Sequence, residues 1–235
     1  MFQFYPTQEE IFSSAACGDY RLQLAWPDQP APASGWPVIF LLDGSLHFPV
    51  AATLMCTLAR PRCCMVPGVV VAIDYPDGTR RERDYRPAVE QPVREANPRG
   101  GHYSPGAAGQ SASFLAFIQQ ELKPYIQRRF NTDPQREVLF GHSYGGLFTV
   151  NTLFTQRDAF QHFYASSPSV WWNDGYIQGP LSIFCSNRPV LRNRRYYSCR
   201  SGSLNNRWNG GKWRFLKRIF WPCNNIAANV AWWTA

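Results

Sequence analysis

At 235 residues, 45% of them hydrophobic, the chain can build one large core and requires no second domain. The net charge of +8 does not by itself indicate a polyanion partner, because the excess of basic over acidic residues lies at one end of the chain. The N-terminal stretch MFQFYPTQEE lacks a signal-peptide pattern and no run reaches the roughly 18 apolar residues of a membrane span, so we expect a soluble, cytoplasmic protein. Seven cysteines without metal-ligand spacing favour reduced thiols and no metal site.

The first part of the chain predicts two antiparallel edge strands and then two buried strands. Alternation of apolar and polar residues indicates the edge pair, and continuous apolar runs indicate the buried pair. A helix between the buried strands is expected to have Pro49 in its first turn and to end at Leu58. The four strands are expected at Glu10 to Ala15, Tyr20 to Trp26, Pro37 to Asp43 and Gly68 to Ile73.

A long polar segment, Asp74 to Gly109, follows and contains RRERDYRP; a segment of that length without periodicity is typical of a functional loop. Ser111 or Ser113 then suits the cap of a helix whose apolar residues recur at helical spacing through Tyr125. A further strand is expected around Phe163 to Ser166. Alternating strands and helices predict an α/β fold with a mainly parallel central sheet flanked by helices.

The stretch EVLFGHSYGGLF predicts a strand, a sharp turn and a helix, with Ser143 at the turn. A residue at such a turn is held in a strained conformation that needs small neighbours, which Gly141 and Gly145 supply. The N–H groups at the start of the helix can stabilise negative charge on a substrate oxygen. We therefore predict a nucleophile elbow, in which Ser143 is the nucleophile of a serine hydrolase.

Such hydrolases need a second donor to the oxyanion, from a loop after an earlier buried strand. The stretch Leu42-Asp43-Gly44-Ser45 has that position, although it could equally be a simple turn that ends a strand. We predict that the backbone N–H groups of Ser45 and Tyr144 form the oxyanion hole.

The charge distribution changes abruptly after Asp174. Up to that residue there are 14 Lys and Arg and 16 Asp and Glu, so the charge is 14 − 16 = −2, whereas residues 175–235 contain ten basic and no acidic residues. If Asp and Glu made up about 12% of the residues, as in an ordinary protein, residues 175–235 would contain about seven of them. The tail is either a basic, aromatic arm for nucleic acid or, as we favour, the product of a shifted frame or a recent replacement. We therefore divide the chain into a core at 1–184 and an aberrant, Trp-rich tail at 185–235.

Several motifs in the same order resemble the putative-esterase branch of the α/β-hydrolase superfamily, and most closely its siderophore trilactone esterases. The resemblance covers about residues 12–182 and is carried by VIFLLDG, RRERDYRP, FLAFIQQELKPYI, FGHSYGGLF and YASSPSVWW. It implies an α/β-hydrolase fold, an acyl-serine intermediate and a small-molecule ester substrate, with no cofactor and no nucleic-acid or membrane partner. By this resemblance Arg83, Tyr85, Arg86 and Trp171 are candidate substrate-binding residues, although arginines on a long loop are commonly just solvated.

The chain departs from the family at the general base. Family members use a histidine near the C-terminus, and this chain has none after His162. We expect His102, His142 and His162 to be structural or solvated, and His47 to be a poor substitute base. A serine without a base is a weak nucleophile, so the resemblance implies an ester hydrolase whose turnover is impaired. The alternative is an inactive ligand-binding protein or a degraded pseudoenzyme.

Overall fold

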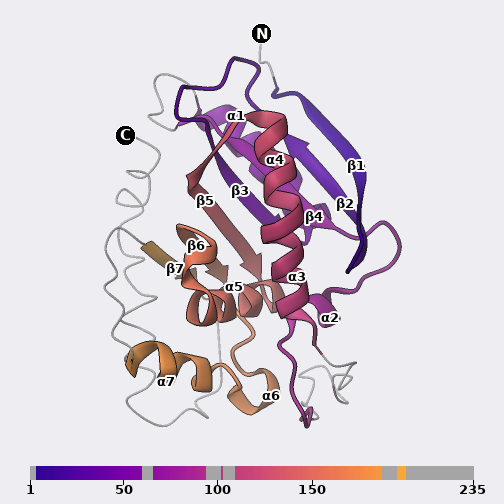
Figure 1. Cartoon of the computed structure of the whole chain (residues 1–235), viewed down its shortest axis with the longest axis vertical. Coiled ribbons are helices and arrows are strands. Elements are labelled where there is room, and N and C mark those ends of the chain that lie inside the picture. The colour runs from indigo at the N-terminus through magenta and orange to yellow at the C-terminus, as the bar shows by residue number, and fades with distance from the viewer. Residues whose placement is uncertain (1–3, 60–65, 94–101, 103–108, 187–194, 200–235) are drawn as a thin grey trace.

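The computed structural model describes residues 4–59, 66–93, 102, 109–186 and 195–199 (Figure 1). Their centre is a sheet of seven strands in the order β1-β2-β4-β3-β5-β6-β7. The β1–β2 and β2–β4 pairs are antiparallel, and the other pairs are parallel. The strands are β1 (Thr7–Ser14), β2 (Gly18–Ala25), β3 (Trp36–Leu42), β4 (Val69–Asp74), β5 (Thr132–His142), β6 (His162–Ser166) and β7 (Arg195–Cys199). The mainly parallel sheet with an antiparallel edge is confirmed.

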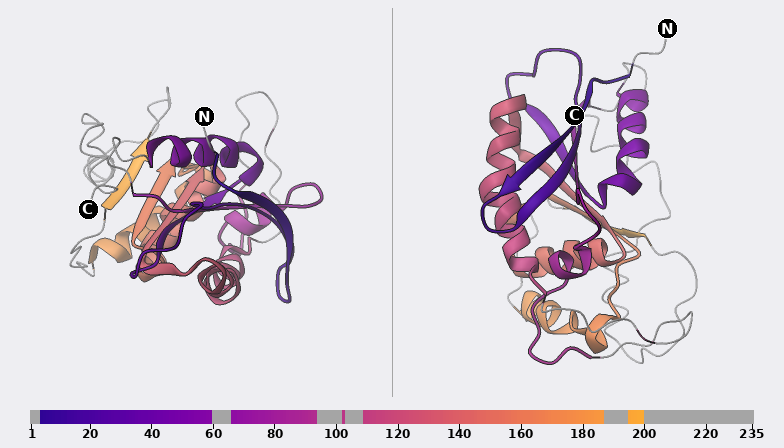
Figure 2. Two further views of the ribbon diagram at one scale, coloured as in Figure 1. Left: turned by 90° about the horizontal axis from the view of Figure 1, so that it is seen from above. Right: turned by 90° about the vertical axis from the view of Figure 1, so that its right-hand side faces the viewer.

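Helices cover both faces of this sheet. Figure 2 shows α1 (Gly44–Leu58) on one side and the long helical run from Ser111 to Phe130 on the other. That run consists of α3 (Ser111–Phe117), a π turn at Ile118–Leu122 and α4 (Lys123–Phe130). The π turn ends at Leu122, two residues before Pro124, which has no N–H to continue the α-helical pattern. The remaining helices are α2 (Arg81–Tyr85), α5 (Tyr144–Thr155), the 3-10 turn η2 (Arg157–Ala159), α6 (Trp172–Gly175) and α7 (Gln178–Ser186).

The central strands are buried on both faces, as their apolar runs predict. Val38, Phe40 and Leu42 of β3 pack into the larger hydrophobic cluster with α3, α4 and α5. Leu41 of β3 faces the other way, into a smaller cluster that includes Met55 of α1. This two-sided burial is typical of parallel strands covered by helices.

Two local predictions are wrong. The helix that we expected to begin near Pro49 begins at Gly44, so Pro49 lies inside α1. Neither serine proposed as the cap before α3 has that role, because Gln110 is the capping position and Ser111 is the first helical residue.

The described part of the proposed tail contains the last residues of α7 and the strand β7, which pairs in parallel with β6. The division at residue 184 stays a prediction, since most of 185–235 lies outside the described residues. Among the described residues, no helix has the length and hydropathy needed to cross a membrane.

Candidate active site

The predicted elbow has the geometry of a strained turn. Ser143 lies between β5 and α5 with φ 56° and ψ −115°, in a region that L residues rarely adopt. A Cβ at Gly141 would lie 2.2 Å from the carbonyl oxygen of Gly145, so no larger residue fits at position 141. The turn therefore presents the Ser143 side chain at the carboxyl end of β5 and at the N-terminus of α5.

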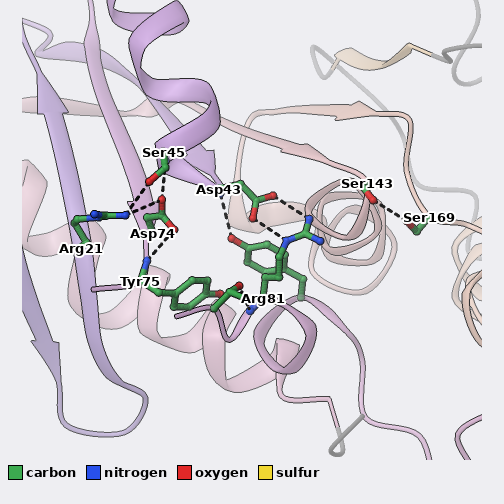
Figure 3. Close-up of polar contacts among 10 residues, drawn as sticks. Arg21, Asp43, Ser45, Asp74, Tyr75, Arg81, Ser143 and Ser169 are labelled. Carbon is green, nitrogen blue, oxygen red and sulfur yellow. Dashed lines mark hydrogen bonds and ion pairs between the residues drawn. The ribbon is translucent and has the colours of Figure 1, made fainter. Parts of the chain in front are cut away.

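The loop after β6 packs directly on this elbow. The Ser143 N–H donates to the carbonyl of Ser166 at 3.1 Å, and the Ser169 N–H donates to the carbonyl of Ser143 at 3.0 Å. The two hydroxyl oxygens of Ser143 and Ser169 are 3.2 Å apart, and Ser169 is only 3% exposed (Figure 3). The Ser143 hydroxyl is thus hydrogen bonded to a buried serine.

The oxyanion-hole prediction fails for Ser45. Its N–H donates to Oδ2 of Asp74 at 2.6 Å, so that carboxylate already occupies the donor (Figure 3). The Ser45 hydroxyl accepts a hydrogen bond from Nη2 of Arg21 at 2.8 Å, which completes the network. Tyr144 is the first residue of α5, as the elbow requires.

The Asp74 carboxylate is stabilised in its ionised form. Burial alone would raise its pKa, but hydrogen bonds from Ser45 and from the Tyr75 N–H, together with the Arg21 charge, hold the pKa below its usual value. Asp74 is therefore an anion that fixes the loop at the start of α1, and sequence reasoning missed it because its partners are distant in the chain.

Asp43, directly before α1, forms the second charged centre. It has φ 55° and ψ 58°, and its buried carboxylate accepts two hydrogen bonds from Arg81, Nε to Oδ1 at 3.0 Å and Nη2 to Oδ2 at 3.1 Å. The Asp43 N–H donates to the Tyr85 hydroxyl at 3.2 Å. Figure 3 shows this pair between the Ser45 network and Ser143.

Two guanidinium groups lie beside the ring of Tyr144, the residue after Ser143. The Cζ atoms of Arg81 and Arg86 lie 5.5 and 5.7 Å from the ring centroid of Tyr144. Arg86 also lies 5.9 Å from the Trp172 ring and is itself 2% exposed. These cation–π contacts fix Tyr144 and place positive charge beside the elbow.

The four candidate substrate-binding residues have different surroundings. Tyr85 is fully buried and Arg86 nearly so, and the structure therefore assigns them to packing, which corrects the sequence-based expectation. Arg83 donates to Asp84 at 2.7 Å and to the carbonyl of Cys17 at 3.3 Å, at the β1–β2 turn. Only Trp171 stays partly exposed next to the elbow, with its ring 6.0 Å from that of Tyr144.

No histidine is hydrogen bonded to Ser143 among the described residues. His162 lies at the amino end of β6, opposite Val138, whereas the elbow follows the carboxyl end of β5. The His47 ring lies 5.0 Å from the Phe140 ring and 6.1 Å from that of His142, and its buried Nε2 has no partner in the described part of the chain. Burial lowers the pKa of His47. Among the residues that the structure describes, no three His, Cys, Asp or Glu side chains are grouped so that they could hold a metal ion.

Comparison with known proteins gives consistent results. A family model described as "Putative esterase" matches residues 13–212. Ferri-bacillibactin esterase BesA of Bacillus subtilis is 34% identical over 182 residues, which are 73% of this chain and 62% of that protein. Siderophore triacetylfusarinine C esterase of Aspergillus fumigatus is 31% identical over 197 residues, 79% of this chain and 63% of that protein.

The fold agrees with a solved structure as well. The BES protein from Bacillus cereus superimposes with a TM-score of 0.71 at 31% identity, covering 82% of this chain and 74% of that one. This chain spans less than two thirds of the length of the two esterases above. The sheet order and the elbow are those of an α/β-hydrolase fold, which confirms the fold prediction. From the family match over most of its length, the chain belongs to the family described as putative esterases.

Proposed function

We propose that this chain is a serine-dependent carboxylic ester hydrolase that acts through an acyl-Ser143 intermediate. The strained position of Ser143 at the N-terminus of α5 is the observation that carries the proposal. It exposes the hydroxyl to a substrate and directs the helix N-terminus toward the developing oxyanion.

For the oxyanion hole we pair the N–H of Tyr144 with that of Gly44 instead of Ser45. Gly44 is the first residue of α1, and its N–H has no hydrogen-bond partner among the described residues. The Asp43–Arg81 pair fixes the turn that presents it. Loss of either donor is expected to cost about 3 kcal/mol of transition-state stabilisation.

The substrate class that we propose is a small-molecule ester of the siderophore type. The names of the similar esterases support it, and so does the chemistry of the site. Trp171 supplies a partly exposed indole for stacking. Arg81, 28% exposed at its side chain, is paired with Asp43, and the guanidinium N–H groups that Asp43 does not use can donate to an anionic group. An ester that carries aromatic, anionic groups fits these surroundings.

We further propose that turnover is severely depressed. Deprotonation of a serine hydroxyl at neutral pH needs a base, and the Ser143 hydroxyl is bonded to Ser169, not to an imidazole. Ester cleavage then depends on binding and the oxyanion hole alone.

Labelling with a fluorophosphonate probe tests both the role of Ser143 and the depressed turnover. We expect a slow, covalent adduct on the peptide that contains Ser143, identified by mass spectrometry, and no adduct in Ser143→Ala. Fast labelling that His47→Ala abolishes would make His47 the base. Fast labelling unaffected by removal of each of the four histidines would mean that the serine is activated in another way.

The second candidate function is ligand binding without turnover, which the Ser143–Ser169 hydrogen bond favours. Saturable binding of a catecholate ester with no hydrolysis and no adduct over long incubation would support it and would contradict the esterase.

The origin of the tail has its own test. If a shifted frame produced residues 185–235, then the coding DNA after the codon for Phe184 should encode acidic residues and a late histidine in another frame. Absence of both from the other two frames would contradict a frameshift.

A further inference from the structure

An open cavity lies at the opposite end of the sheet from Ser143. Its volume is about 510 Å³, within the range of small-molecule pockets. Trp36, the first residue of β3, and Asn131, directly before β5, both line it. A bulge in β5 places Thr132 opposite Trp36 and Glu137 opposite Val38, so along the sheet β5 is only about as long as the seven-residue β3. At a rise of about 3.3 Å per residue, roughly 20 Å separates the two ends. The cavity is therefore distinct from the ester site.

Aromatic side chains form the walls of this cavity. The rings of Trp26 and Phe130 lie 5.2 Å apart at 40° to each other, and Trp36 completes the lining. The backbone N–H of Trp36 donates to the backbone carbonyl of Asn131 at 2.9 Å, which joins the start of β3 to the end of α4. Gly35 has φ 84°, and a Cβ there would lie 2.7 Å from the backbone of Thr132. The aromatic side chains that line the cavity therefore project from tightly packed backbone segments.

The charge of the lining is positive. Two arginines and no carboxylate line the cavity. Arg129 is compensated, because its Nη1 lies 2.6 Å from Oε2 of Glu10 and its guanidinium packs 5.1 Å from the Phe130 ring centroid. Arg128 is exposed and has no ion-pair partner among the described residues.

Flat apolar faces and one uncompensated guanidinium recognise a planar, negatively charged molecule. An aromatic ring can pack against Trp26 and Phe130, while a carboxylate accepts two hydrogen bonds from the fork of Arg128. We propose that this cavity is a binding site for a small aromatic carboxylate. The inference is independent of the proposed esterase activity, because none of its residues belongs to the Ser143 site.

Equilibrium dialysis of the full chain with 2-naphthoate tests the proposal. We expect one saturable site, with affinity at least tenfold lower for the neutral 2-naphthamide. Arg128→Gln should weaken naphthoate binding at least tenfold, because it keeps a polar side chain and removes the charge. The matched control Arg157→Gln changes an exposed arginine on η2 outside the cavity and should leave binding unchanged.

The position of the ligand is read from the indole N–H resonances, assigned with Trp26→Phe and Trp36→Phe. We expect naphthoate to shift the Trp26 and Trp36 signals in the wild-type chain. The proposal is overturned by absent or unsaturable binding, by equal affinity of Arg128→Gln and Arg157→Gln, or by shifts confined to Trp171 and Trp172.

Discussion

Two adjacent glycines at the start of α5 differ in the space around them. A Cβ at Gly146 would lie 2.8 Å from Cα of Pro168 and 3.0 Å from the carbonyl oxygen of Ser166, in the loop that packs on the elbow. Because backbone atoms cannot withdraw as a flexible side chain can, we expect Gly146→Ala to lower the free energy of unfolding by about 1–3 kcal/mol in urea denaturation.

Gly145→Ala is the matched control for this change. The nearest atoms to a Cβ there are 3.4 Å away, which is ordinary contact, and alanine favours a helix over glycine by about 1 kcal/mol. Its stability should stay equal or rise. Equal losses in both variants would mean that the contact with Pro168 does not limit position 146.

His47 should make stability depend on pH. Burial lowers its pKa; the nearby Asp43 charge opposes this shift, whereas His142 and Arg81 add to it. In the unfolded chain His47 has its ordinary pKa of about 6.5, so below that pH the unfolded state binds more protons than the folded state. The free energy of unfolding therefore falls as the pH drops from about 6.5 through the lower pKa of His47 in the folded protein. We expect His47→Gln to lose less stability than wild type between pH 7.5 and 5.5, measured by urea denaturation. An unchanged pH dependence, equal to that of the exposed-site control His102→Gln, would contradict this.

Helix α1 carries an exposed apolar stripe. Leu46, Val50, Leu54 and Leu58 recur every four residues with 70, 61, 50 and 40% exposure, and the helix contains no Asp, Glu, Lys or Arg. We expect Val50→Lys/Leu54→Lys to shorten retention on a hydrophobic-interaction column and to change stability by about 0.5 kcal/mol at most. Retention should fall less for Ile183→Lys, which removes one exposed residue of α7; equal shifts would show that the stripe does not act as one surface.

Elements with strong local signals could be predicted from the sequence. The apolar runs of β3 and β4 and the glycine-flanked turn at Ser143 indicate their structures without tertiary information. The start of α1 could not be predicted, because Pro49 also suits a first turn and the true first residue, Gly44, is a weak helix former.

The site was predicted less completely, because its contacts come from distant segments. In α2, residues four apart share a face, so Arg81 and Tyr85 both reach Asp43, whereas Arg83 points to the β1–β2 turn. Because RRERDYRP was interpreted from the sequence as part of a long loop, this helical spacing was not used. The Ser45 N–H is taken by Asp74, 29 residues later, and no local pattern signals that pairing.

At the scale of the whole molecule, a buried ion pair holds together elements on one side of the sheet. Nζ of Lys123, at the start of α4, lies 2.5 Å from Oε2 of Glu137 in β5 and also donates to the carbonyl of Ala159 before β6. It lies 3.8 Å from the ring centroid of Phe160. Burial lowers the pKa of Lys123 and raises that of Glu137, so each charge depends on the other.

Removing one member of this pair should destabilise the fold strongly. Lys123→Met leaves a buried carboxylate without its cation, and we expect a loss of about 3–5 kcal/mol at pH 8 by urea denaturation. Glu137 with a further raised pKa binds a proton in the folded state, so the deficit should shrink as the pH falls from 8 to 5. The double variant Lys123→Met/Glu137→Leu should recover most of the loss, since neither charge is then buried. A double variant as unstable as the sum of the two single variants, with a deficit that does not depend on pH, would mean that the two side chains stabilise the protein separately.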